Sequence, residues 1–262
     1  MKTTSLVVTT TLALSLASDA AEAANVRTIV NKANIMAYYQ GKDGRAKVRL
    51  TIVDDQGRKR YRQFTILRRN LKPGGDQNFL VLFTRPADVR RTVFMVAKKV
   101  GRDDDRWMYL PALDLVKRIA ASDKRTSFVG SHFFYEDISG RGLDEDHHRL
   151  LKTTDSHYVV RATPKNAGSV EFKHFDVWID KQKMIPTKME YVDRSGKLYR
   201  RIEALVIEDK DGYPTVTKMK ATDLASGGYT ISEMKGIKYD IDVPQDVFAE
   251  RSLRNPPRRW MR

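Results

Sequence analysis

The sequence contains acidic residues and histidines that could take part in acid–base catalysis or bind a metal, but their spacing favours neither function. Glu136 and Asp137 are adjacent, and neighbours on a strand point to opposite faces, which is poor geometry for a shared acid–base role. His147 and His148 are adjacent too, and neighbours in a helix point about 100° apart, which is unfavourable for joint metal ligation. The acidic run 103–105 lacks the alternating ligands and closing glutamate of a calcium loop. We therefore expect no catalytic residue, no metal site and no cofactor.

Cationic side chains predict a different chemistry, the binding of anions. The 262-residue chain has 48 Lys and Arg against 33 Asp and Glu, a formal net charge of +15. Residues 58–72 hold seven cations and no acid, and residues 251–262 hold five arginines beside Trp260. Solvation of an ordinary surface is the equally weighted alternative for such clusters. From the two clusters we select, as docking or headgroup residues, Arg58, Arg60, Arg62, Arg258 and Arg259.

The first 23 residues have the layout of a secretory signal peptide. Lys2 provides the positive start, residues 6–17 form an apolar stretch, and Ala21-Glu22-Ala23 is a small-x-small cleavage pattern. The chain has no cysteine, which excludes thiol chemistry and a lipid-modified N-terminal cysteine. We expect a soluble protein of the bacterial periplasm. Export argues against nucleic acid as the partner and favours anionic lipid headgroups or an acidic docking surface.

The elements that position these residues are mostly strands. Residues 47–53 and 58–67 alternate around a turn at 54–57 and predict a β-hairpin. Residues 79–84 and 92–97 are apolar on both faces, which is typical of strands covered on both sides. Further strands are expected at 157–163, 169–180, 185–192, 197–208, 214–222 and 228–240, with short helices at 26–33 and 143–151. This pattern predicts a mainly β protein with an antiparallel sheet curled into a sandwich or barrel.

One segment carries a family resemblance. It contains Trp-x-Tyr-Leu-Pro at 107–111, Arg-Ile at 118–119, and Ser-Phe-x-Gly-Ser-x-Phe-x-Tyr-Glu-Asp at 127–137. This order of motifs resembles the outer-membrane lipoprotein-sorting proteins, the LolA-like family, and within it the branch associated with RND-type exporters. Residues 83–89 also look like the approach to this region, and the resemblance extends from about residue 30 to about residue 250.

The resemblance implies a fold and a function. The fold would be a single curved antiparallel sheet forming an incomplete β-barrel, with a few helices over its concave face and a hydrophobic cavity between them. The function would be a periplasmic, non-enzymatic carrier of lipid or lipoprotein acyl chains between an inner-membrane RND-type exporter and an outer-membrane acceptor. We expect a signal peptide at 1–23, the carrier domain at 24–250 and a basic C-terminal tail at 251–262. The better-known lipoprotein carrier holds its helical lid shut with a strand arginine, for which the sequence reveals no counterpart.

Eleven apolar and aromatic side chains are candidates for the cavity wall. Alternation along a strand allows only about half of them to face it, and the rest would be ordinary core. They are Phe79, Val81, Phe83, Phe94, Val96, Trp107, Tyr109, Phe128, Phe133, Phe134 and Tyr135. Two other functions stay open. A structural or binding module of an envelope complex would have a packed interior in place of a cavity, and a hydrolase would need a paired acid and base.

Overall fold

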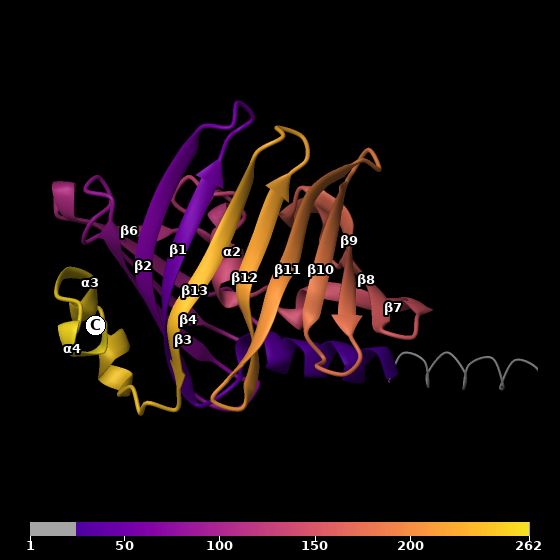
Figure 1. Ribbon diagram of the computed structural model, residues 1–262, viewed down its shortest axis with the longest axis horizontal. Helices are drawn as coiled ribbons and strands as arrows, with labels where there is room; N and C mark the ends of the chain where they lie inside the picture. The colour runs from indigo at the N-terminus through magenta and orange to yellow at the C-terminus, as the bar shows by residue number, and fades with distance from the viewer. Residues whose placement is uncertain (1–24, 262) are drawn as a thin grey trace, which may run out of the picture.

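The computed structural model describes residues 25–261 and shows a strongly curved sheet with helices on both sides (Figure 1). The expected signal peptide, residues 1–23, lies outside the described residues. No helix between residues 25 and 261 is long and apolar enough to cross a membrane.

One antiparallel sheet of thirteen strands dominates the described part of the chain. Its spatial order is β6-β5-β4-β3-β2-β1-β13-β12-β11-β10-β9-β8-β7. Consecutive strands are neighbours except β6 and β7, which lie at opposite edges, and β13 returns beside β1. The expectation of a mainly β, single, curved antiparallel sheet is confirmed. The strands are β1 (Asp43–Val53), β2 (Lys59–Asn70), β3 (Gln77–Arg85), β4 (Val93–Lys98), β5 (Asp105–Leu110), β6 (Leu115–Ile119), β7 (Asp146–Thr153), β8 (His157–Pro164), β9 (Phe172–Asp180), β10 (Pro186–Asp193), β11 (Leu198–Lys210), β12 (Tyr213–Asp223) and β13 (Tyr229–Tyr239).

Alternation along the strands creates an interior face. In β1, Val48, Leu50 and Ile52 are buried in one apolar cluster, while the alternate residues Lys47 and Arg49 are exposed. This period of two is what a strand with one covered face requires. The interior cluster continues across both halves of the sheet and forms the larger core.

Strands β3 and β4 are buried on both faces, as their doubly apolar sequences predict. Their outer face packs against the C-terminal segment 241–261, which includes η5 (Gln245–Phe248), α3 (Arg251–Arg254) and α4 (Arg258–Met261). Leu253 is fully buried there, and the Met261 carbonyl accepts a hydrogen bond from the Thr65 hydroxyl. The basic residues 251–261 therefore lie against the outer face of the sheet (Figure 1).

Helices lie over the interior face. The first described helix spans 25–38, which confirms the one expected around 26–33, and α2 (Tyr135–Ser139) lies opposite the middle of the sheet. Four single-turn helices connect strands: η1 (Pro111–Leu113), η2 (Ala121–Asp123), η3 (Leu143–Glu145) and η4 (Ala167–Ser169). The helix expected at 143–151 is wrong, because only its first turn is helical and the rest is strand β7. Pairing of β7 with β8 along the edge of the sheet overrides the helical spacing of the leucines there.

Candidate functional site

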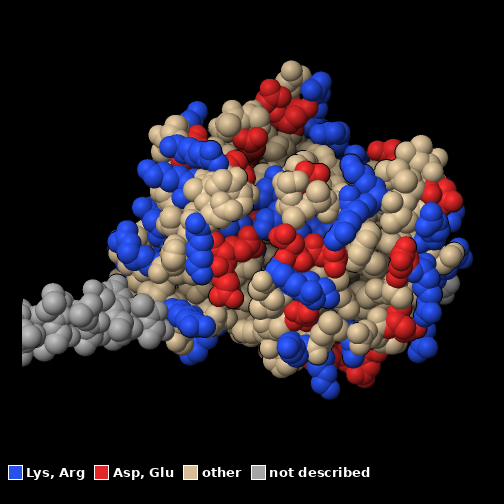
Figure 2. Space-filling view, turned by 180° about the vertical axis from the view of Figure 1, so that it is seen from behind, with Lys and Arg blue, Asp and Glu red and all other residues tan. Residues whose placement is uncertain are grey.

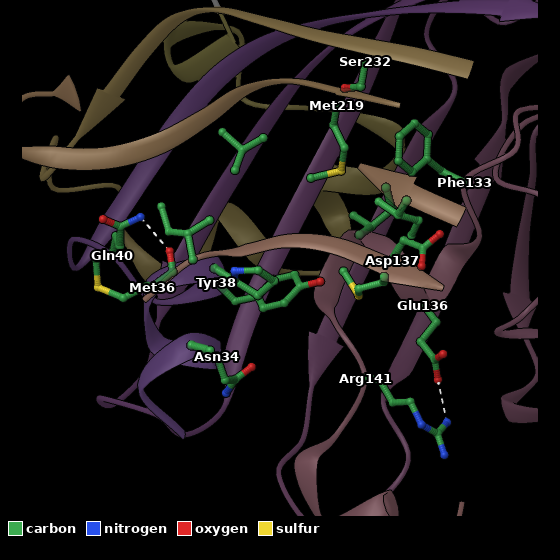
Figure 3. A pocket seen from close by; sticks show the side chains of 18 of the residues that line it. Asn34, Met36, Tyr38, Gln40, Phe133, Glu136, Asp137, Arg141, Met219 and Ser232 are labelled. Atoms are coloured by element: carbon green, nitrogen blue, oxygen red, sulfur yellow. Dashed lines mark hydrogen bonds and ion pairs between the residues drawn. The ribbon is translucent and has the colours of Figure 1, made fainter. Parts of the chain in front are cut away.

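A cavity of about 360 Å³ lies between the N-terminal helix 25–38 and the interior face of the sheet. This volume falls within the range of about 300–1,000 Å³ that is usual for small-molecule sites. The helix contributes apolar side chains from successive turns, and the strands contribute their inward-facing positions (Figure 3). The principal apolar lining residues are Val30, Ala33, Met36, Ala46, Val48, Leu50, Phe64, Phe79, Phe128, Phe133, Val160, Ala162, Val177, Met189, Met219 and Met234.

Methionine is frequent in this wall. Met36 comes from the helix, Met189 from β10, Met219 from β12 and Met234 from β13, and all four are only partly buried. A thioether chain has three rotatable bonds and can repack around ligands of different shape. The wall is therefore suited to a flexible apolar ligand.

Tyr38 brings the main polar group of the helix into the cavity. Its ring lies against Gly140, where an added Cβ would stand 2.7 Å from ring atoms, so only glycine fits beside it. Its hydroxyl extends toward α2 and forms no hydrogen bond with any described residue (Figure 3). Burial and the nearby Asp137 carboxylate raise the pKa of Tyr38, so the hydroxyl stays neutral. It is free to donate to a ligand carbonyl or phosphoryl oxygen.

A buried ionic network attaches α2 and the preceding loop to the sheet. Glu136 accepts from Arg125 at 2.6 Å and Arg141 at 3.2 Å, and Lys124 lies 3.4 Å from it. Burial raises the pKa of Glu136, but these three cations outweigh that effect and hold it below its ordinary value. A carboxylate shared by three cations has no free oxygen for acid–base work, so the network is a structural support.

Asp137 forms a second attachment. Its carboxylate accepts from the backbone N–H of Phe134 at 2.7 Å, which caps α2, and from the Arg200 guanidinium of β11. Arg200 also lies 4.0 Å from the centre of the Phe134 ring and is almost fully buried. This ion pair connects the motif segment to the opposite half of the sheet.

Two further cations hold the C-terminal ends of the two helices over the cavity. Arg68 of β2 donates to the carbonyl of Tyr38 at 2.5 Å and to that of Gln40. Lys98 of β4 donates to the carbonyls of Ser139 and Gly140 at the end of α2, and its ammonium lies 5.3 Å from the centre of the Tyr38 ring. Positive charge at a helix C-terminus also interacts favourably with the helix dipole. Arg68 is thus a strand arginine that fastens the helix over the cavity.

A second, more polar cavity of about 960 Å³ lies on the other side of the helix. Its wall includes the loop 99–104, the end of α2 and the start of β7, and Arg141 and Asp146 border both cavities. Seen from the side of the helices, acidic side chains gather near the middle of this face among basic ones (Figure 2). Many of these charges are already paired, Arg106 with Asp104 at 2.6 Å among them.

Comparison with known sequences decides the family. The model of an uncharacterized protein family, DUF1329-like, matches residues 75–255. The chain belongs to the DUF1329-like family. No curated protein matches it.

Solved structures resemble this DUF1329-like chain over most of its length. A DUF1329 family protein from Desulfovibrio piger is 27% identical with a TM-score of 0.79, and the match covers 88% of this chain and 98% of that one. A putative outer membrane lipoprotein-sorting protein domain from Vibrio parahaemolyticus is 25% identical with a TM-score of 0.81, covering 88% and 99%. A LolA superfamily protein from Nitrosomonas europaea, 21% identical with a TM-score of 0.67 and coverage of 86% and 98%, shares the fold. The resemblance to LolA-like proteins is therefore confirmed.

The structure distributes the eleven expected wall residues over four environments. Phe79, Phe128 and Phe133 line the cavity. Phe134 lies beneath the Arg200 guanidinium, outside the cavity wall. Five others belong to the same interior cluster but do not line the cavity and are ordinary core: Val81, Phe83, Phe94, Val96 and Tyr135.

Trp107 and Tyr109 lie on the opposite face of the sheet. Met108 between them faces the interior cluster, so alternation directs its two neighbours outward. There they pack with the C-terminal segment, and Arg254 of α3 lies 5.6 Å from the centre of the Tyr109 ring. They are part of the outer core and do not line the cavity.

The two basic clusters occupy different faces. Arg60 and Arg62 pair with Ile52 and Leu50, so they extend the interior face toward its rim, where Arg62 lies 3.5 Å from Asp88. Arg58 is exposed and forms an ion pair with Asp54. Arg258 and Arg259 are exposed on α4, which packs on the outer face of β2.

Sequence reasoning missed the helix 25–38 and strands β8–β13 as sources of the cavity wall. The helical spacing of Val26, Ile29, Val30 and Ala33 indicated an apolar face, and the methionines of β10, β12 and β13 were a second available signal. Both signals point to burial, and burial does not distinguish a cavity wall from a packed core.

Lys98 makes the stability of this region dependent on pH. Burial lowers the pKa of Lys98 to about 8 in the folded protein, whereas the pKa of a lysine in the unfolded chain is near 10.4. Between these two pH values the Lys98 amine is protonated in the unfolded chain and mostly neutral in the folded one. The free energy of unfolding must rise with pH in that window. From pH 7 to pH 10, we expect urea titrations to show the wild type gaining about 2–3 kcal/mol relative to Lys98→Met. A constant difference between the two proteins across this range would contradict the assignment.

Proposed function

We propose that this protein is a periplasmic carrier that holds the acyl chains of a lipid or lipoprotein in the interior cavity. It would take them from an inner-membrane RND-type exporter and deliver them to an outer-membrane acceptor. The observation that carries the proposal is the apolar cavity of about 360 Å³ beneath the N-terminal helix. The similarity to a putative outer membrane lipoprotein-sorting domain supports the same class of cargo.

The energetics agree with a carrier. Removing one CH₂ group from water contributes about 0.8 kcal/mol, so a 16-carbon chain represents about 12 kcal/mol before the costs of binding. Crossing an aqueous compartment unaided would be slow for such a molecule. The apolar lining replaces water around the chain, while Arg68 fastens the N-terminal helix and Lys98 fastens the end of α2.

Native mass spectrometry of the protein purified from its own periplasm tests the proposal. We expect adducts with the masses of acylated lipids or lipopeptides, released by detergent. Repeated isolation of adduct-free protein that also fails to bind added fatty acid would contradict the carrier function. A structural module of an envelope complex is the second candidate, and it predicts a filled interior where this chain has a cavity.

We further propose that Arg58, Arg60 and Arg62, at the start of β2, dock the carrier to a membrane or exporter. Replacing Arg58, Arg60 and Arg62 with Ser should weaken sedimentation with anionic vesicles several-fold at physiological salt and leave the melting temperature within a few degrees. The matched control replaces three exposed lysines of the other half of the sheet, Lys152, Lys173 and Lys183, and should have little effect. If both variants lost vesicle binding equally, the net charge of the protein and not the position of these arginines would determine binding, which would contradict the proposal.

A further inference from the structure

Strands β12 and β13 are hydrogen-bonded over only part of their length. Both have eleven residues, but their pairing runs only from Lys218–Glu233 to Thr222–Tyr229. Beyond that point β12 continues along β11 as far as the Lys210–Tyr213 pair, while β13 continues along β1 as far as Tyr239–Gly44. The sheet therefore splits between 213–217 and 234–239, and the two strands diverge toward this end (Figure 1).

Two residues explain why the ladder stops. Pro214 has no backbone N–H to donate, so it is compatible only with the edge of a ladder. Gly236 has a φ of 58°, a left-handed conformation that glycine adopts without strain, and it lies where β13 bulges against β1 between Arg45 and Lys47. These local features bend the two strands apart.

Both rims of the split line the apolar cavity. Thr215 and Val216 contribute from β12, and Ile237 and Tyr239 contribute from β13. The cavity thus reaches the gap between the strands, and only side chains close it. Tyr213 and Tyr239 have ring centres 4.7 Å apart, and the hydroxyls of Thr215 and Tyr239 are 2.9 Å apart.

The N-terminal helix adds one bond across the same end. The amide of Gln40, just beyond the helix, donates to the Pro214 carbonyl at 2.8 Å and to the Met36 carbonyl at 2.7 Å (Figure 3). Its own carbonyl oxygen is buried without a partner among the residues that the structure describes. Rotating a few side chains would open the gap without breaking the backbone ladders on either side.

The outer face beside the split has unusual charge. Arg45 of β1 lies directly opposite Lys238 of β13, and Lys47 lies directly opposite Lys235. Like charges in such cross-strand positions repel each other. Ala46 and Met234 face the interior, so these cations face outward. Among the described residues Arg45, Lys47 and Lys235 form no side-chain ion pair, and Lys238 has only a partly exposed contact with Asp211 at 3.9 Å. Arg45 also lines the cavity, and within residues 25–261 its buried Nε has no hydrogen-bond partner.

We infer that the split between β12 and β13 is the portal through which an acyl chain enters and leaves, with its anionic headgroup held outside by Arg45, Lys47, Lys235 and Lys238. This inference rests on the proposed carrier function and specifies its cargo as an acyl chain attached to a phosphate or carboxylate. The chain passes through the sheet into the cavity, while four unpaired or weakly paired cations supply the charge-assisted hydrogen bonds that such a headgroup requires.

A reversible cross-link across the split tests the portal. The chain has no cysteine, so Val216→Cys and Ile237→Cys can be joined specifically by a bismaleimide with a reducible spacer. The probe is dansyl-labelled undecanoic acid, followed by stopped-flow fluorescence. We expect cross-linking to slow both association and release at least about ten-fold with little change in equilibrium affinity, and reduction of the spacer to restore both rates.

The matched control joins Glu203→Cys to Lys220→Cys, which are directly opposite in the intact β11–β12 ladder, and should leave the rates unchanged. Unchanged rates in the Val216–Ile237 protein, or rates that stay slow after reduction, would overturn the portal. Failure of the carrier function itself gives a different result, because the unmodified protein would then show no saturable binding of the probe.

The headgroup site is tested by changing Arg45, Lys47, Lys235 and Lys238 to Gln. Competition against the dansyl probe should show about ten-fold or greater loss of affinity for hexadecyl phosphate and little change for hexadecanol. The control removes four cations around the polar cavity instead: Arg27, Lys99, Arg102 and Lys165. A loss only in the control would overturn the headgroup assignment, and displacement by inorganic phosphate alone would show a free-anion site instead.

Discussion

Replacing Met219 with Trp should lower the affinity for acyl ligands at least about ten-fold. Met219 is a partly buried residue of β12 in the cavity wall, and an indole there would occupy space that a chain needs. Each CH₂ that the ligand can no longer bury loses about 0.8 kcal/mol, so exclusion of two groups already gives this loss. Titration of the variant with a fluorescent fatty acid measures the effect.

Met219→Leu is the matched control, because it conserves volume and should bind within a few-fold of the wild type. The melting temperature of Met219→Trp should remain close to that of the wild type, since the indole enters a space that is not tightly filled. Undiminished affinity in a folded Met219→Trp protein would mean that the chain binds elsewhere.

Replacing Asp137 with Asn should cost about 3–5 kcal/mol of unfolding free energy, the range for breaking a buried ion pair. The amide oxygen can still cap α2, but Arg200 would retain its charge with only the His132 carbonyl and aromatic rings around it. Urea denaturation measures the loss. Glu208→Gln, which removes an exposed pair with Lys210, should change the unfolding free energy by less than about 1 kcal/mol.

A double variant separates the unpaired charge from the lost bond. Asp137→Leu combined with Arg200→Met replaces the pair by apolar groups and should recover much of the stability lost in Asp137→Asn. If the double variant is no more stable than the single one, the cap of α2 and local packing matter more than the buried charge of Arg200.

These contacts give the motif at 127–137 a structural meaning. Phe128 is fully buried, Gly130 has a φ of 75°, and Ser131 donates to the Phe128 carbonyl, so this part forms a tight turn within the core. Asp137 attaches α2 to β11 through Arg200, and Glu136 attaches it to the preceding loop through Arg125. The residues that revealed the family therefore support the cavity, and only Phe128, Phe133, Glu136 and Asp137 of this motif also border it.

The sequence alone determined ten of the thirteen strands and which of them are covered on both faces. Alternation in 47–53 and the doubly apolar runs at 79–84 and 92–97 are local signals, because side-chain direction in a strand follows the backbone period. The same local reasoning failed at 143–151, where pairing with β8 decided the conformation.

Only the tertiary structure decided which buried residues surround a cavity. Phe79 and Phe83 lie on the same strand and both are buried, yet only Phe79 lines the cavity. The sequence pattern reports removal from water, whereas a cavity depends on the separation of elements distant in the chain, here the helix 25–38 and strands β8–β13. The split between β12 and β13 also depends on tertiary structure, since pairing with β11 and with β1 holds apart the two strands that Pro214 and Gly236 bend locally.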